Sequence, residues 1–440
     1  MTAAPPLSEG RFRLFLSIYL LLFTNAFYSL FSSFEGGLLS AKSGESVEYQ
    51  IVLVSAYAVL MYKLLSSWSR VLYKLLHSTA LLSLVGSALA SYLLIGAETI
   101  SIIRFSMFVG TILLALFVAE SYSADDVYTT FFWTSAFILA VHFLLLPALA
   151  DKIVYDNNER TTLVGVLSYA GLFAHKTTAG EVFALSAIVA LPRCFQNGAR
   201  LAARFVFIGS VLAIILAGAI GPLIGLLLVF GVGFEIYSLR ANHMAIAFFS
   251  LLVAALLIFL LYIIGLNEVL GIFGRSRDFT GRDFLIESWP SFFLEHPILG
   301  YGFNGFFTGV SGAPAERLWE LVEGAQYSTF ESFYLELLIQ FGLIGGIIYS
   351  VIVLKAFLNT VRLLRDDKSG SSYVPILILM FMLFCGIVQA SMLLQNYIVL
   401  LLLFWIYFGC GCNVAAQRPT FPMERHLTLP RASAFPPFRS

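Results

Sequence analysis

Three arginines lie close together in the stretch GRSRDFTGRDF, at Arg275, Arg277 and Arg282. A guanidinium group is always charged, and its planar fork of N–H donors matches the oxygens of a phosphate group. The cluster therefore predicts a cradle for a diphosphate. The alternative is a solvated charge run in which the arginines pair with Asp278 and Asp283.

A carboxylate at Glu331 opens the stretch ESFYLELLIQFGLIGG, and Glu336 follows five residues later. A carboxylate partly removed from water gains basicity, which suits a general base that takes a proton from a sugar hydroxyl. The alternative for Glu331 is an ordinary acid in the first turn of a helix that Ser328 caps.

His175 and Lys176 lie in GLFAHKTTAGE, where we expect Thr177 or Thr178 to cap the start of a helix. The N-terminus of a helix favours anions, so this pair predicts a substrate-binding site. Glu181 would lie one turn further in, where an ionisable group in an apolar run is costly. Its alternative role is to complement the helix dipole.

The stretch EHPILGYGFNG holds Gly300, Gly302 and Gly305 in the G-x-G-x-x-G spacing that binds dinucleotides in other proteins. That fold needs a buried strand before the glycines, but Pro297 stands there instead. We therefore expect a reentrant turn that passes close to other backbone, with no cofactor and no metal. We expect the neighbouring His296 to contact substrate.

The composition shows what must position these residues. Of the 440 residues, 59% are hydrophobic and 12% are charged, and the mean hydropathy is +0.88. An aqueous domain is about a quarter charged, so lipid must surround most of this chain. A formal net charge of zero gives no indication of nucleic-acid binding.

About twelve apolar runs are long enough to cross a bilayer core of about 30 Å, which predicts an all-α polytopic membrane protein. They lie at 12–34, 49–66, 71–95, 99–119, 128–150, 177–192, 201–217, 219–237, 243–265, 331–357, 373–393 and 395–413.

Charge predicts the orientation of these spans. With a cytoplasmic N-terminus, the short outer loops hold only Lys42, Lys152, Arg160 and Lys176, while most basic residues face the cytoplasm. The connection SYSADDV, on the inside, has no basic residue and does not follow this bias. The predicted membrane domain covers residues 1–413, with one large periplasmic loop at 266–330 and a disordered cytoplasmic tail at 414–440.

The stretches TGRDFLIESWPSFFLEHPILGYGFNGF and ESFYLELLIQFGLIGG, with GLFAHKTTAGE before them, resemble the family of O-antigen ligases and O-antigen and exopolysaccharide polymerases. The resemblance extends to a layout of about twelve spans with one large outer loop. It implies glycosyl transfer at the periplasmic face of the bacterial inner membrane, without a metal or a nucleotide sugar. Arg282 matches the arginine of the family's Gly-Arg pair, so the resemblance implies that Arg282 stabilises the departing diphosphate.

The donor that this resemblance implies is a glycan on undecaprenyl diphosphate, and the acceptor is a glycan hydroxyl. Membrane lipid and a chain-length regulator are the other expected partners. The ligases usually carry a histidine where this chain has Glu331, and a Ser-Arg-Gly where it has Ala219, Ile220 and Gly221. These departures favour a polymerase of repeat units. The alternatives are an O-antigen ligase that transfers polymer to lipid A core, a polysaccharide flippase or transporter, and an inactive relative.

Overall fold

The computed structural model consists of α-helices joined by turns and short 3-10 helices throughout the residues that it describes. These are residues 9–26, 47–66, 68–95, 99–153, 169, 171–173, 175–195, 200–240, 282–308, 314–321, 327–366 and 370–410. The all-α prediction is confirmed over this part of the chain. The predicted span 243–265, the tail 414–440 and the sites at Arg275 and Arg277 lie outside it.

The helices before the outer loop are α1 (Glu9–Phe23), α3 (Val47–Ser66), α4 (Trp68–Leu76), α5 (Thr79–Ile95), α6 (Thr99–Ser121), α7 (Ala124–Ile153), α8 (Lys176–Arg193), α9 (Arg200–Ala217) and α10 (Ile220–Arg240). The later ones are α13 (Arg282–Phe293), α14 (Pro314–Leu321), α15 (Phe333–Asp366), η1 (Gly370–Tyr373), α16 (Val374–Cys385), η2 (Ser391–Leu393) and α17 (Ile398–Tyr407).

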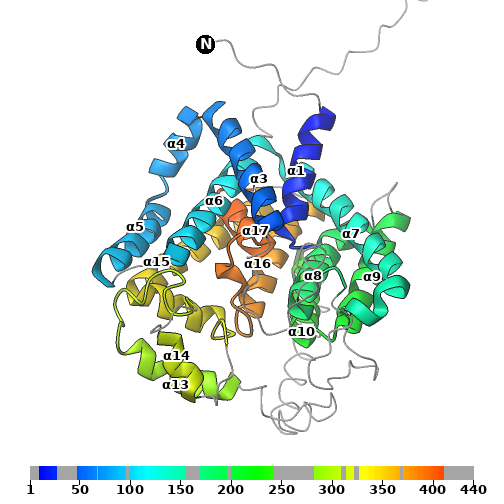
Figure 1. Cartoon of the computed structure of the whole chain (residues 1–440). Helices are drawn as coiled ribbons and strands as arrows, with labels where there is room; N and C mark the ends of the chain where they lie inside the picture. The colour runs from blue at the N-terminus through cyan, green and yellow to red at the C-terminus, as the bar shows by residue number, and fades with distance from the viewer. Residues whose placement is uncertain are drawn as a thin grey trace, which may run out of the picture.

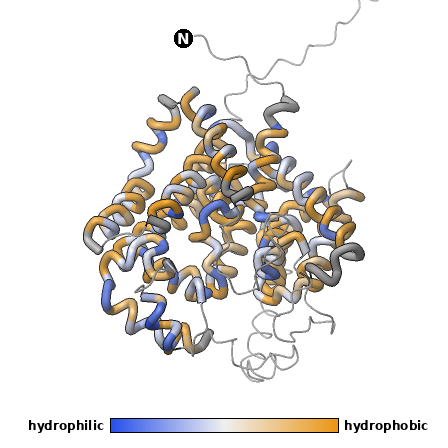
Figure 2. The backbone as a smooth tube through the Cα atoms, viewed as in Figure 1, coloured by the Kyte–Doolittle hydropathy of each residue, from blue (hydrophilic) through white to orange (hydrophobic). Residues whose placement is uncertain are grey.

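Several of these helices are suited to a bilayer. By length and composition, Ser101–Ser121, Ala124–Leu145, Arg200–Ala217 and Phe333–Arg365 can each cross it. Shorter apolar helices accompany them, including Thr79–Leu93, Val374–Cys385 and Ile398–Tyr407. In Figure 2 the helices are mostly hydrophobic along their length, whereas α13 and α14 carry several hydrophilic turns. The chain is therefore a polytopic membrane protein, and the count of twelve crossings stays a prediction.

Three predicted spans are wrong in outline. The run 71–95 is divided between α4 and α5, because the His77–Ser78 turn ends the first helix and the Ser78 carbonyl accepts the Leu82 N–H at the start of the second. The runs 373–393 and 395–413 also stop short, since α16 ends at Cys385 and α17 begins at Ile398. Between them lies the interhelical segment 386–397, in which Asn396 has a left-handed backbone with a φ of 56°.

Most of the buried apolar side chains form one core that runs through the bundle, with α16 and α17 near its middle (Figure 1). The outer loop packs around a second, smaller core, formed mainly by aromatic side chains, which also includes one residue of α15. It contains Leu285, Phe292, Tyr301, Phe306, Phe307, Ala315, Leu318, Phe330 and Ile339. This second core holds α13 and α14 at the end of the bundle opposite the start of α1 (Figure 1).

Basic side chains of helices distant in the sequence pair with acidic residues at and beside the connection SYSADDV. Arg13 of α1 lies 4.0 Å from Asp126 at the start of α7, and Lys74 of α4 forms an ion pair with Glu120 at the end of α6. This acidic connection therefore lies near the start of α1 and the basic last turn of α4. Tertiary contacts explain how the connection fits there without a basic residue of its own.

Candidate functional site

The outer loop crosses a break in α15. Gly342 has a φ of 60° and a ψ of −165°, which interrupts the helix and frees backbone groups on both sides. The loop supplies the missing partners through three hydrogen bonds: Tyr301 N–H to Ile339 O at 2.8 Å, Leu343 N–H to Pro297 O at 2.8 Å and Ile344 N–H to Ile298 O at 3.2 Å. Irregular backbone is tolerated at membrane depth when protein satisfies it in this way.

Glycine is required on both sides of this crossing. A Cβ on Gly300 would lie 2.4 Å from the Ile339 carbonyl oxygen, and a Cβ on Gly342 would lie 2.3 Å from the Ile298 carbonyl. Both glycines also have positive φ values, of 65° and 60°. The predicted reentrant turn that passes close to other backbone is therefore confirmed.

The amides of this glycine stretch are bonded within the protein. Gly300 N–H donates to the His296 carbonyl at 2.9 Å, and Gly305 N–H donates to the Gly302 carbonyl at 2.9 Å. In a dinucleotide site such amides face the pyrophosphate. The G-x-G-x-x-G spacing serves chain packing here.

Side chains of α5 and α6 hold the carbonyl groups of the same stretch. Tyr92 Oη donates to Phe303 O at 2.7 Å, Ser101 Oγ donates to Asn304 O at 3.1 Å, and Arg104 Nη1 donates to Phe307 O at 3.4 Å. The turn is therefore fixed against two bundle helices as well as against α15.

Glu331 lies where the outer loop returns to the bundle. Its φ is 56°, and its N–H donates to Thr329 Oγ1 at 3.2 Å. Because α15 begins only at Phe333, the alternative that placed Glu331 in the first helical turn is wrong. A non-glycine residue in this left-handed region costs about 1–2 kcal/mol, and such strain is often found at functional sites.

The start of α15 packs on the interhelical segment 386–397. Phe333 N–H donates to the carbonyl groups of Gly386 at 2.8 Å and Gln389 at 3.0 Å, and Ser332 Oγ donates to Gly386 O at 3.4 Å. Glu331 is therefore presented at a junction of the outer loop, α15 and this segment.

Two buried polar side chains lie just beyond this junction. Glu336 and Gln340 are each only 3% exposed and lie one helical turn apart on α15. Glu336 Oε2 accepts the Phe330 N–H at 2.9 Å, and Glu336 Oε1 accepts Gln340 Nε2–H at 2.7 Å. Gln340 Oε1 accepts the Asn304 N–H at 3.1 Å. One turn of α15 thus binds both the glycine stretch and the residue before Glu331.

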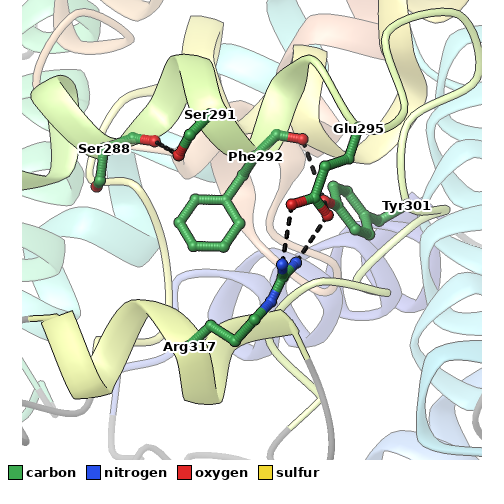
Figure 3. A network of polar contacts seen from close by, with 6 residues as sticks. All are labelled: Ser288, Ser291, Phe292, Glu295, Tyr301 and Arg317. Carbon is green, nitrogen blue, oxygen red and sulfur yellow. Dashed lines mark hydrogen bonds and ion pairs between the residues drawn. The ribbon is translucent and has the colours of Figure 1, made fainter.

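An ion pair joins Arg317 of α14 to Glu295, two residues after the end of α13 (Figure 3). Arg317 Nη1 and Nη2 donate to Glu295 Oε1 at 2.9 Å and Oε2 at 2.7 Å, and Tyr301 Oη also donates to Oε2 at 2.7 Å. The Arg317 guanidinium lies over the Phe292 ring, 5.2 Å from its centroid, and the His296 ring contacts that of Tyr301. These contacts fix α14 against the end of α13.

Acidification is expected to loosen this contact. The hydrogen bond from Arg317 lowers the pKa of Glu295 below its ordinary value of 4.5, so the pair stabilises the fold above that pH and loses its effect as the pH falls further. Both side chains are more than a third exposed, so solvent screening keeps the effect below about 1 kcal/mol. The protection of peptide 314–321 from hydrogen exchange, relative to the intrinsic rate at each pH, should fall at acidic pH, and Arg317→Met should show low protection at every pH. Equal pH dependence in both proteins would contradict this assignment.

The start of α8 differs from the prediction. The N-cap is His175, whose Nδ1 accepts the Thr177 N–H at 3.2 Å, so neither threonine caps the helix. An imidazole nitrogen two residues ahead of the amide replaces the expected hydroxyl. Glu181, further along α8, is 2% exposed, and its Oε2 accepts Tyr397 Oη–H at 2.7 Å.

The interhelical segment 386–397 therefore contacts both the α8 region and the start of α15. Tyr397 binds Glu181, while Gly386 and Gln389 accept from Phe333. His175 and Lys176 start α8, and Glu331 lies just before the start of α15. Both helices therefore contact the same segment, 386–397. No local sequence pattern indicated that the break between α16 and α17 would connect them.

The arginine cluster is only partly placed. Arg282 is the first residue of α13, but its side chain is not among the parts that the structure describes. Arg275 and Arg277 lie wholly outside the described residues. Sequence reasoning missed the roles of Gln340 and Arg317. The four-residue spacing of Glu336 and Gln340 within an apolar run was the available signal for the first of these.

Comparison with known proteins identifies two relationships. Residues 205–350 match the family model described as O-Antigen ligase, a region that includes the glycine stretch, Glu331 and Gly342. The Exopolysaccharide production protein ExoQ of Rhizobium meliloti (strain 1021) is 26% identical over 243 residues. That match covers 51% of this chain and 54% of the relative, so it spans about half of either protein. Both comparisons confirm the resemblance noted in the sequence.

Proposed function

We propose, from the similarity of residues 205–350 to the O-antigen ligase family model, that this chain polymerises lipid-linked glycan repeat units as a membrane glycosyltransferase. The observation that carries the proposal is the placement of Glu331. Within the matched region, this carboxylate has a left-handed backbone at the junction of the outer loop, α15 and segment 386–397. Polymerisation rather than another transfer is favoured because the relative is a protein of exopolysaccharide production.

In the proposed reaction, an acceptor sugar hydroxyl attacks the anomeric carbon of a glycan on undecaprenyl diphosphate. The hydroxyl proton passes to the Glu331 carboxylate as the new carbon–oxygen bond forms. The bond from the anomeric carbon to the diphosphate oxygen breaks, and the diphosphate leaves with its electron pair. Arg282 is the proposed stabiliser of that charge, assisted by Arg275 and Arg277.

Three further side chains have proposed substrate contacts. His175 and Lys176 lie at the start of α8, where the helix dipole favours a negatively charged group. His296 lies at the outer surface beside the pair of Glu295 and Arg317, and we assign it to the glycan.

The proposed location is the bacterial inner membrane with the reacting groups at the periplasmic face. Helices α13 and α14 of the outer loop lie at the end of the bundle opposite the start of α1 and opposite α4, and this supports the orientation (Figure 1). Arg13 of α1 and Lys74 of α4 are the basic residues there that pair with Asp126 and Glu120. Membrane lipid surrounds the apolar helices, and a chain-length regulator is a proposed protein partner.

An O-antigen ligase is the second candidate function, because the matching family model carries that description. In that case the same groups would transfer finished polymer to lipid A core. The chain has Glu331 where the resembled ligases have a histidine, so we place this candidate second.

The glycan made by a deletion strain of the source organism tests the proposal. Loss of a polymerase should leave single repeat units, loss of a ligase should leave long polymer on its carrier, and loss of a flippase should leave repeat units inside the cell. Complementation with Arg282→Ala should restore the protein to the membrane without restoring polymer. Full-length polymer from this variant would contradict the role given to Arg282.

A further inference from the structure

Two residues beside α15, one within the outer loop and one directly after it, have unusual backbone conformations. Asn304 has a φ of 53°, and Glu331 has a φ of 56°. Non-glycine residues occupy this region only when their surroundings hold them there. Gln340 accepts the backbone N–H of Asn304, and Glu336 accepts the backbone N–H of Phe330, the residue directly before Glu331.

We infer that Glu336 and Gln340 are positioning residues that fix the backbone at Glu331, an inference that rests on the proposed function of Glu331. Glu336 holds Phe330 directly, and Gln340 connects Glu336 to the glycine stretch at Asn304. The bond between Gln340 and Asn304 ties this turn of α15 to the glycine stretch. The position of Glu331 therefore depends on where the glycine stretch lies.

The hydrogen bonds of this network have a fixed direction. Two donors, the Phe330 N–H and the Gln340 amide, need two acceptor oxygens at position 336. The Asn304 N–H needs one acceptor oxygen at position 340. A carboxyl group at 336 and a carboxamide at 340 satisfy all three bonds.

Each single exchange removes part of this pattern. Glu336→Gln leaves one acceptor oxygen for two donors, and turning the Gln340 amide round would place its NH₂ group against the Asn304 N–H. Gln340→Glu places two carboxyl groups together and removes the donor between them. Either variant should lower polymer formation about tenfold, since a buried donor or acceptor loses its partner.

The exchanged pair Glu336→Gln with Gln340→Glu restores the pattern in reverse. The carboxyl group at 340 can accept from both the Asn304 N–H and the carboxamide at 336, whose oxygen can accept the Phe330 N–H. We expect the double variant to recover polymer formation to within about threefold of the original protein, which requires strong coupling between the two positions. Glu287→Gln, an exposed acid-to-amide change on α13, is the matched control and should not alter polymer formation.

The experiment uses the full chain in a deletion strain, with equal membrane levels of every variant, and hydrogen exchange of the purified protein in lipid nanodiscs. Peptides that contain Asn304 and Phe330 should exchange faster in both single variants and recover protection in the exchanged pair. The inference is supported if polymer formation and hydrogen-exchange protection fall together in the single variants and recover together in the exchanged pair. Normal polymer from the single variants, or no recovery in the exchanged pair, would overturn it.

The experiment distinguishes failure of the proposed function of Glu331 from failure of the inference about Glu336 and Gln340. If Glu331→Gln makes normal polymer while the exchange rates change as described, Glu331 is not the base and the inference about its positioning falls with it. If Glu331→Gln is inactive and the single variants are normal, the proposed function stands and only the inference is wrong.

Discussion

Glu331→Gln is expected to reduce polymer formation by about 10²- to 10⁴-fold, because a positioned general base contributes about that factor. The substitution retains the size of the side chain and the left-handed backbone, so the loss reports the missing carboxylate. The measurement is the length and amount of polysaccharide made by the deletion strain complemented with each variant. In vitro, transfer from a polyprenyl-diphosphate-linked glycan gives the same comparison.

Two controls sharpen this experiment. Glu320→Gln changes an exposed acid on α14 in the same loop and should make normal polymer. Glu331→His introduces the residue that the resembled ligases carry, and we expect it to retain more activity than Glu331→Gln because an imidazole can accept the proton. Normal polymer from Glu331→Gln would exclude the proposed role.

Gly342→Ala is expected to release the outer loop from α15. The new Cβ would lie 2.3 Å from the backbone of Ile298, and the φ of 60° would be unfavourable for alanine. Relief of this clash breaks the hydrogen bonds that the N–H groups of Leu343 and Ile344 donate to Pro297 and Ile298, within a helix apolar enough to cross a membrane. We expect a loss of at least about 3 kcal/mol in the free energy of unfolding, from strain and unpaired backbone groups together, and no polymer.

Thermal unfolding in a fixed detergent measures the first effect, and polysaccharide analysis measures the second. Gly86→Ala is the control, since a Cβ on Gly86 of α5 meets no atom within 4 Å and a helical alanine is favourable. An unchanged melting temperature for Gly342→Ala, with normal polymer, would show that the crossing is not needed. Gly300→Ala approaches the same crossing from the loop and should behave like Gly342→Ala.

The functional residues could be predicted unevenly from the sequence. Glu331 was identified because a carboxylate at the start of an apolar run is chemically conspicuous. Gln340 was not, because a lone amide in such a run has no distinctive pattern of its own. Gln340 matters because its Oε1 accepts the backbone N–H of Asn304, which lies 36 residues earlier in the chain.

The sequence by itself determined the all-helical class, the polar loop before α15 and the need for glycine where backbones approach closely. These follow from composition and local sterics, which act between near neighbours in the chain. Only the tertiary structure decided that Gly342 opens α15 to admit residues 297–301, and that segment 386–397 contacts both α8 and α15. Such hydrogen bonds depend on the packing register of distant helices, so the same letters G-x-G-x-x-G can face a phosphate in one protein and a broken helix in this one.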